Sequence, residues 1–157
     1  MNGDATAEHG LRFESPLLAM GGNGVAATTV LKLTSDEHVV GLRKLVRERA
    51  LEMKLSLVDQ TKIVTAASEL ARNTIKYGGG GVALVHKLVD GPREGMRLVF
   101  GDDGPGIADV ALALTDGYTT GGGLGLGLSG SKRLVDQFEL DSRVGQGTVV
   151  CITKWKR

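Results

Sequence analysis

Glu69-Leu70-Ala71-Arg72-Asn73 precedes two glycine-rich runs, Gly101-Asp102-Asp103-Gly104-Pro105-Gly106-Ile107 and Gly121-Gly122-Gly123-Leu124-Gly125-Leu126-Gly127-Leu128-Ser129. In a helix, residues four apart share one face, so Glu69 and Asn73 lie side by side. A carboxylate accepts a proton from an attacking hydroxyl, and an amide oxygen is a hard ligand that suits Mg²⁺. Glycine loops let backbone N–H groups approach phosphates closely. The sequence therefore predicts a site for a nucleotide, a metal and a nucleophile.

The composition indicates a single packed domain. The chain has 157 residues, 41% of them hydrophobic, and a formal net charge of +1. A length in this range suits one domain, and no basic block indicates a nucleic-acid surface. Cys151 is the single cysteine, so an intrachain disulfide is excluded and a cytoplasmic location is expected.

No apolar run approaches the roughly 18 residues that a membrane span requires, so we expect no membrane partner. The N-terminus lacks the basic start and apolar centre of a signal peptide. Residues 1–25 mix glycine, asparagine, alanine and polar residues, which predicts a flexible tail. The folded domain is expected over residues 26–157.

Hydrophobic periodicity predicts strands at residues 26–33, 82–89, 96–100, 140–144 and 148–155. It predicts helices at residues 36–54 and 128–138, a further one that begins after Ser56 and stops at Gly78, and a short one at 108–114. Thr34 and Glu37 match a capping box, and Ser56 is expected to cap the second long helix. Residues 90–95 are expected to connect a hairpin.

This order of elements predicts a two-layer α/β sandwich with a mixed, mostly antiparallel sheet and helices on one face. A doubly wound parallel sheet would need alternating strands and helices. Gly123-Leu124-Gly125-Leu126-Gly127 is no Rossmann fingerprint, because no strand directly precedes it and no βαβ unit surrounds it. The run also lacks the Gly-Lys-Ser/Thr ending of a Walker loop.

Taken together, the Glu69/Asn73 pair, Asp102-x-Gly104-x-Gly106, the Gly-Leu-Gly-Leu-Gly run and Gly145-x-Gly147-Thr148 resemble the GHKL (Bergerat-fold) ATP-binding superfamily. Within it the chain is most similar to RsbT-type serine/threonine kinases of the stressosome. The segments that carry this closer likeness are 68–73, 116–122, 130–138 and Lys154-Trp155. The resemblance begins at about Lys32 and runs to the C-terminus.

The resemblance implies a role for each matching position. Glu69 would be the general base, Asn73 would ligate Mg²⁺, and Lys76 would reach a phosphate. Asp102 would accept a hydrogen bond from the adenine amino group, supported by Thr148. Residues 115–127 would form a lid over ATP. The implied nucleotide contacts are Asn73, Lys76, Asp102, Gly104, Gly106, Ile107, Thr119, Thr120, Gly121, Gly122, Gly123, Leu124, Gly125, Leu126, Gly127 and Thr148.

Two positions depart from the pattern of the relatives. Asp103 stands where relatives often have an amide, and two adjacent carboxylates repel. Ser129 stands where proline is expected. Outside this context, Glu69 and Lys76 would fit an ordinary solvated helix face. The basic flank of the first long helix, formed by Arg43, Lys44, Arg47 and Arg49, fits a solvated face or a partner-binding face equally well.

The resemblance implies a protein serine/threonine kinase that uses ATP, releases ADP and needs Mg²⁺. Its implied substrates are STAS-domain proteins of the RsbS/RsbR kind. After release, it would activate a PP2C-type phosphatase through an RsbU-like regulatory domain. An anti-sigma factor that sequesters a sigma factor is the alternative, and a binding-only nucleotide switch is the third possibility. Glu69 argues against the third, because a switch without chemistry needs no base.

Overall fold

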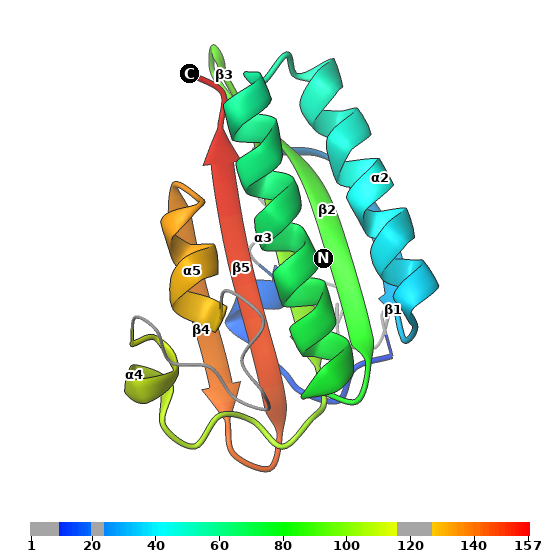
Figure 1. The fold of residues 1–157 in the computed structure, drawn as a ribbon, viewed down its shortest axis with the longest axis vertical. Coiled ribbons are helices and arrows are strands. Elements are labelled where there is room, and N and C mark those ends of the chain that lie inside the picture. Colours follow the sequence, from blue (N-terminus) through cyan, green and yellow to red (C-terminus); the bar gives the residue numbers. More distant parts are fainter. Residues whose placement is uncertain (1–9, 20–23, 116–126) are drawn as a thin grey trace.

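The computed structural model describes residues 10–19, 24–115 and 127–157, which build a five-stranded antiparallel sheet with a helical layer on one face (Figure 1). The strand order is β1-β2-β3-β5-β4. The strands are β1 (Val25–Leu33), β2 (Gly81–Asp90), β3 (Arg93–Asp102), β4 (Gln137–Arg143) and β5 (Gly147–Trp155). This architecture confirms the predicted two-layer α/β sandwich, with a sheet that is antiparallel throughout the described strands.

Three helices lie side by side over the sheet, with α3 (Leu57–Lys76) between α2 (Asp36–Glu52) and α5 (Gly127–Arg133) (Figure 1). Alternate residues of the strands face this layer, because successive side chains in a strand point to opposite sides. The main core therefore joins the inward stripe of α2 and α3 to residues such as Ala83, Val85, Phe100 and Val150. A short α4 (Val110–Ala113) follows the first glycine-rich run, close to the helix predicted at 108–114.

Serine hydroxyls cap both long helices. Ser56 accepts a hydrogen bond from the backbone N–H of Asp59, as the sequence predicted. The expected capping residue of α2 was wrong by one position. Ser35 has the extended backbone of a cap and accepts from the N–H of His38, whereas the Thr34 hydroxyl bonds the His38 ring. A hydroxyl at either position satisfies a free N–H, so the pattern alone did not separate them.

The opposite face of the sheet carries a second, smaller core. Residues 1–25 were expected to form a flexible tail, but the described residues 10–19 of that range differ from this expectation. Leu11, Phe13 and Leu18 are buried against the sheet, and the 3₁₀ turn η1 (Pro16–Ala19) contacts β3, β4 and β5. The strand residues of this core are Val82, Leu84, Val99, Val149 and Cys151. Burial of these large apolar side chains offsets part of the chain entropy that the segment loses on ordering.

Two predicted boundaries were wrong. The helix expected over 128–138 ends at Arg133, and Phe138 already belongs to β4, where it pairs with Ile152. Phe138 and Leu140 point into the main core from the strand, so pairing with β5 overrides local helical periodicity. The β2–β3 hairpin is also tighter than predicted, because Asp90 pairs directly with Arg93 across a two-residue turn. Within the described part of the chain, every helix is too short or too polar to cross a membrane.

Candidate nucleotide-binding site

The flank of α3 that holds Glu69 and Asn73 is half-buried, whereas Val64 and Ser68 on the other flank are buried. The Glu69 side chain is 15% exposed, and its Oε1 lies 3.4 Å from the guanidinium of Arg72, which is itself exposed. Glu69 is thus shielded from most solvent while the guanidinium that pairs with it points outward. Such a carboxylate remains available to a group that approaches along this flank of the helix.

The end of α3 delivers the chain to the first glycine-rich run. The backbone carbonyl of Asn73 accepts hydrogen bonds from the N–H groups of Tyr77 at 2.9 Å and Gly78 at 3.3 Å. Gly78 then packs against Asp102, since a Cβ at residue 78 would overlap the Asp102 carboxyl carbon. Gly81 pairs with Asp102 across the β2–β3 ladder. The Asn73 carbonyl therefore accepts a hydrogen bond from Gly78, the residue that contacts the Asp102 carboxyl group.

Asp102 is a buried acid at the end of β3, only 7% exposed. Its Oδ1 accepts a hydrogen bond from the backbone N–H of Gly104 at 2.9 Å. Burial raises the pKa of Asp102 from 3.8 to about 6. The N–H groups of Gly104 and Thr148 work in the opposite direction, and the charge of Asp103 adds to the rise. A buried acid with so few neutralising partners is typical of a ligand site.

A hydroxyl pair ties the glycine loop to β5. The Ser142 hydroxyl accepts a hydrogen bond from the N–H of Ile107 and shares another with the Thr148 hydroxyl, each at 2.8 Å. Gly106 has a φ of +76°, and a Cβ there would overlap the carbonyl of Arg143. Glycine is required at this position by both conformation and space. Thr148 faces Asp102 across the β3–β5 ladder.

The remaining predicted positions are only partly described. Lys76 is exposed at the end of α3, with its Nζ 5.2 Å from the centre of the Tyr77 ring. Gly127, with a φ of +67°, begins α5, and its carbonyl accepts from the Ser131 hydroxyl at 3.2 Å. The other predicted lid contacts lie outside the described residues: Thr119, Thr120, Gly121, Gly122, Gly123, Leu124, Gly125 and Leu126.

The structure brings together Asp102, Gly104 and Thr148 and ties the backbone of Asn73 to the adjacent Gly78. It adds two residues that sequence reasoning missed. Gly78 was interpreted only as a helix stop, although its position in a run of four glycines was a signal of close packing. Ser142 left no signal, because its hydroxyl reaches the site only through β4–β5 pairing.

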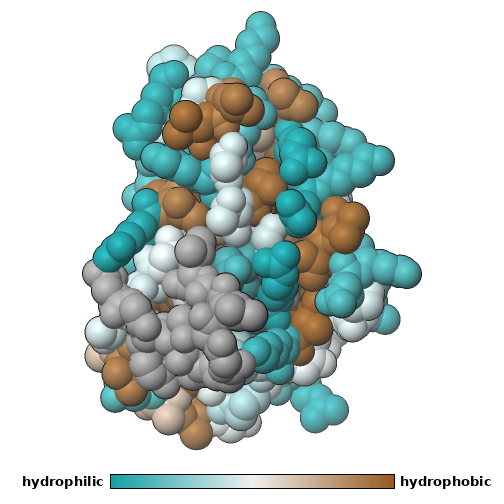
Figure 2. All heavy atoms as spheres, in the orientation of Figure 1, coloured by the Kyte–Doolittle hydropathy of each residue, from teal (hydrophilic) through white to brown (hydrophobic). Residues whose placement is uncertain are grey.

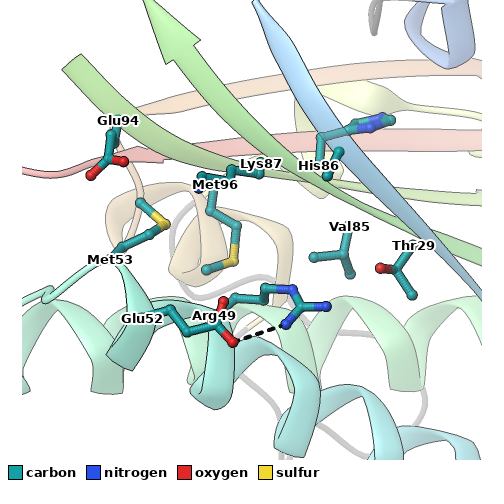
Figure 3. Close-up of a pocket in the computed structure, with 10 residues that line it drawn as sticks. Thr29, Arg49, Glu52, Met53, Val85, His86, Lys87, Glu94 and Met96 are labelled. Carbon is teal, nitrogen blue, oxygen red and sulfur yellow. Dashed lines mark hydrogen bonds and ion pairs between the residues drawn. The ribbon is translucent and has the colours of Figure 1, made fainter. Parts of the chain in front are cut away.

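One hollow of the molecule lies away from this site. It is lined by Arg49, Met53, Val85 and Met96, between α2 and strands β1 to β3, where Arg49 binds Glu52 (Figure 3). On the helix-covered face, apolar side chains are scattered among polar ones (Figure 2). Neither feature contains Asp102, so the candidate site rests on the acid and its glycine neighbours.

Among the residues with described positions, no three His, Cys, Asp or Glu side chains form a metal cluster. Mg²⁺ in a nucleotide site does not need one, since it keeps several waters and is held by one or two protein oxygens together with substrate phosphates. The half-buried Asn73, which carries an amide oxygen, fits this sparse donor set. The residues present are thus compatible with Mg²⁺ delivered with a nucleotide.

The sheet, the helical layer and the glycine-bordered acid define a nucleotide-binding ATPase-type domain. Residues 58–157 match the family described as Histidine kinase-, DNA gyrase B-, and HSP90-like ATPase. A relative named Serine/threonine-protein kinase RsbT, from Bacillus subtilis (strain 168), is 41% identical over 127 residues, which are 81% of this chain and 96% of that protein. The chain belongs to this ATPase family and, within it, is a serine/threonine-protein kinase of the RsbT type.

More distant relatives share the fold. Two proteins named Anti-sigma F factor, from Thermoanaerobacter sp. (strain X514) and Thermoanaerobacter pseudethanolicus (strain ATCC 33223 / 39E), are each 27% identical over 78% of this chain and 89% of their own. A crystal structure of RsbU and RsbW domains from Mycobacterium tuberculosis matches with a TM-score of 0.57 at 18% identity. That match covers 84% of this chain and 33% of the larger protein, and it supports the fold.

Proposed function

We propose that this kinase binds ATP with its adenine against Asp102 and transfers the γ-phosphate to a serine or threonine of a STAS-domain partner. The observation that carries the proposal is the buried carboxyl of Asp102, placed against Gly78 and Gly104 at the end of the helix that bears Glu69 and Asn73. A buried acceptor flanked by glycines suits a flat base with an amino group, because side chains would block its approach.

Asp102 accepts a hydrogen bond from the adenine amino group in this proposal, while Thr148 holds the carboxyl group in place from β5. The N–H groups of Gly104 and Thr148 already donate to that carboxyl. The site is therefore preorganised before the nucleotide arrives, which lowers the ordering cost of binding. Asn73 offers its amide oxygen to the metal that accompanies the phosphates, and Lys76 offers its charge from the next turn of α3.

Glu69 accepts the proton of the attacking hydroxyl. It lies one helical turn before Asn73 on the same flank, so base and metal ligand face the same volume. When bound, Mg²⁺ supplies neutralisation of the phosphate charge that develops during transfer. The side chain of Glu69 is mostly shielded from solvent, and Arg72 holds one of its oxygens from the exposed side.

The name of the 41% identical relative supports a role in a partner-switching system. We propose that STAS-domain proteins of the RsbS/RsbR kind are the substrates. The kinase would then activate a PP2C-type phosphatase through an RsbU-like regulatory domain in stress signalling. We further propose that it acts in the cytoplasm, without nucleic-acid or membrane partners.

The anti-sigma factors among the relatives favour a second function, in which the chain sequesters a sigma factor. The kinase function consumes ATP in repeated phosphoryl transfers, whereas sequestering a sigma factor requires only binding. Purified chain, radiolabelled ATP and the STAS-domain protein of the same organism would yield a phosphorylated STAS protein if the kinase proposal is correct. Tight capture of a sigma factor, with no label on the STAS protein, would instead support the anti-sigma function.

A further inference from the structure

Residues 11–18, here named the N-terminal strap, lie ahead of the region that resembles the kinase family and pack on the face of the sheet opposite the helices. Leu11, Phe13 and Leu18 are all buried, with Phe13 only 2% exposed. Each of three strap contacts falls on a residue adjacent to Asp102 or Thr148, the two residues placed at the adenine end of the site.

The first contact is with the residue before Asp102. A Cβ on Gly101 would lie 2.7 Å from Cδ1 of Leu11 and 3.5 Å from Cδ2 of Leu18. The strap thus fills the space that a side chain at residue 101 would need. Gly101 is the first residue of the glycine-rich run. The strap therefore restricts the side chain at one end of the run that also holds Asp102.

The second contact is with the residue after Asp102. The carboxylate of Asp103 accepts hydrogen bonds from the backbone N–H groups of Arg12, at 2.8 Å, and Phe13, at 2.7 Å. Hydrogen bonds from backbone donors to an ionised acceptor are among the stronger ones in proteins. Asp103 therefore holds the strap against the end of β3.

The third contact is with the residue before Thr148. A Cβ on Gly147 would lie 3.0 Å from Cβ of Phe13 and would overlap the carbonyl oxygen of Asp102 on its other side. Gly147 is therefore enclosed between Phe13 and the backbone of Asp102. The guanidinium of Arg143 lies 5.8 Å from the centre of the Phe13 ring and extends the contact toward the glycine loop.

We propose that the N-terminal strap is a positioning element of the nucleotide site, with Phe13 and Asp103 as positioning residues that set the adenine contact of Asp102 and Thr148. The inference rests on the proposed function of that site. Closely packed interiors transmit small displacements. Loss of the strap removes the support behind Gly101, Asp103 and Gly147 at once, so the carboxyl of Asp102 and the N–H of Thr148 lose their fixed relative positions.

The test uses the full chain and measures ATP and ADP binding by calorimetry, together with transfer to the STAS-domain substrate at saturating ATP. Asp103→Ala removes the acceptor of the strap, and Phe13→Ala removes its side chain. In each variant, the affinities for ATP and for ADP should fall by the same factor of about ten, because the two nucleotides share the adenine end. The turnover number should stay within about twofold, as expected when ground-state and transition-state binding are lost equally.

Two further variants separate positioning from general destabilisation. Phe13→Leu restores an apolar side chain in contact with Gly147 and should recover most of the affinity. Val46→Ala removes a buried side chain of α2 from the main core on the other face of the sheet and should lower stability while leaving nucleotide affinity unchanged. If Phe13→Ala fails to fold, Asp103→Ala decides the matter, since Asp103 is exposed and its substitution leaves no cavity.

Wild-type affinity in both Asp103→Ala and folded Phe13→Ala would overturn the inference, as would a loss of turnover with unchanged affinity. An equal loss of affinity in Val46→Ala would also overturn it. A wild-type chain that binds no ATP would instead refute the proposed function itself. These outcomes keep the two failures distinct.

Discussion

Gly78 lies directly against the carboxyl group of Asp102, so closely that a Cβ on residue 78 would overlap Cβ, Cγ and Oδ2 of that side chain. The contact joins the turn that follows α3 to the end of β3. A glycine is therefore needed at residue 78 for space, and its neighbours in the run Gly78–Gly81 have different roles.

Gly78→Ala should displace the Asp102 side chain and weaken ATP binding by at least about tenfold. Calorimetric titration of the folded variant measures this effect. Gly79→Ala is the matched control, because Gly79 has a φ of +75° but a Cβ at this residue would meet nothing within 4 Å. The control should lose about 1 kcal/mol of stability from backbone strain and keep its affinity. Equal affinity losses in both variants would contradict a specific contact with Asp102.

Asp102→Asn should change stability and affinity in opposite directions. Because burial raises the pKa of Asp102 to about 6, the folded state binds more protons than the unfolded state between about pH 4 and pH 6. The free energy of unfolding therefore falls as pH rises through this window. The rise in the pKa of Asp102 from 3.8 to about 6 corresponds to about 3 kcal/mol of stability, and this stability is lost in full above pH 6.

The asparagine variant does not titrate, so denaturant unfolding should show it to be more stable than wild type above pH 6 and similar to wild type near pH 4. Its ATP affinity should nevertheless fall at least about tenfold, since a changed acceptor leaves a buried donor poorly paired. A variant with unchanged ATP affinity would remove Asp102 from the adenine contact. A variant less stable than wild type at pH 8 would contradict the burial argument.

The sequence predicted most of the fold because its signals were local. The α3 stripe repeats at helical spacing, Ser56 stands at the cap, and β3 ends at an acid followed by glycines. The approximate position of Asp102 at a strand end, four residues from Gly106, followed from this pattern. Burial, hydrogen-bond donors and the raised pKa of Asp102 did not, because they depend on β5 and on the turn after α3.

What the sequence did not reveal depends on contacts between distant residues. Asp103 was interpreted as a repulsive neighbour of Asp102, yet it binds backbone groups of Arg12 and Phe13, about ninety positions earlier. Lys154, near the C-terminus, is buried and pairs with Asp59 and Asp136, which no local pattern indicated. In each case the partner was set by sheet topology, for which periodicity carries no information.

Glu69→Gln should leave ATP binding intact and reduce phosphoryl transfer by about 10²–10⁴-fold, the usual contribution of a general base. A radiolabel assay with the STAS-domain substrate measures transfer, and calorimetry measures binding. Glu52→Gln is a matched control, because Glu52 forms the same i,i+3 pair with Arg49, at 3.2 Å, on α2. Near-wild-type transfer by Glu69→Gln, or an equal loss in Glu52→Gln, would show that Glu69 is not the base.

Asn73→Ala should weaken ATP binding in the presence of Mg²⁺ and leave binding in excess chelator almost unchanged, because the proposed amide oxygen acts on the metal. Titrations with and without Mg²⁺ give the two affinities. Thr65→Ala, on a half-buried position of the same helix two turns earlier, provides a control for helix packing. An equal loss with and without metal would assign Asn73 to packing or to direct nucleotide contact.

Lys154 is a buried cation, 3% exposed, whose Nζ lies 3.3 Å from Oδ1 of Asp59 on α3 and 3.6 Å from Oδ1 of Asp136 before β4. Burial alone would raise the pKa of Asp136. The N–H of Trp155, followed by the charges of Lys154 and Arg157, outweighs burial and lowers that pKa below 3.8. This cluster joins β5, α3 and the start of β4.

Lys154→Met should lower the free energy of unfolding at pH 7 by about 3–5 kcal/mol, because it leaves two shielded carboxylates without their shared cation. Since the pKa of Asp136 is lowered in the folded state, its stabilising contribution is present above about pH 4 and is lost as pH falls further. The difference in free energy of unfolding between wild type and Lys154→Met should therefore become smaller in acid. Lys156→Met, at an exposed position two residues on, should change stability by less than about 0.5 kcal/mol. Equal, small losses in both variants across the pH range would mean that the Lys154 cluster does not hold the three elements together.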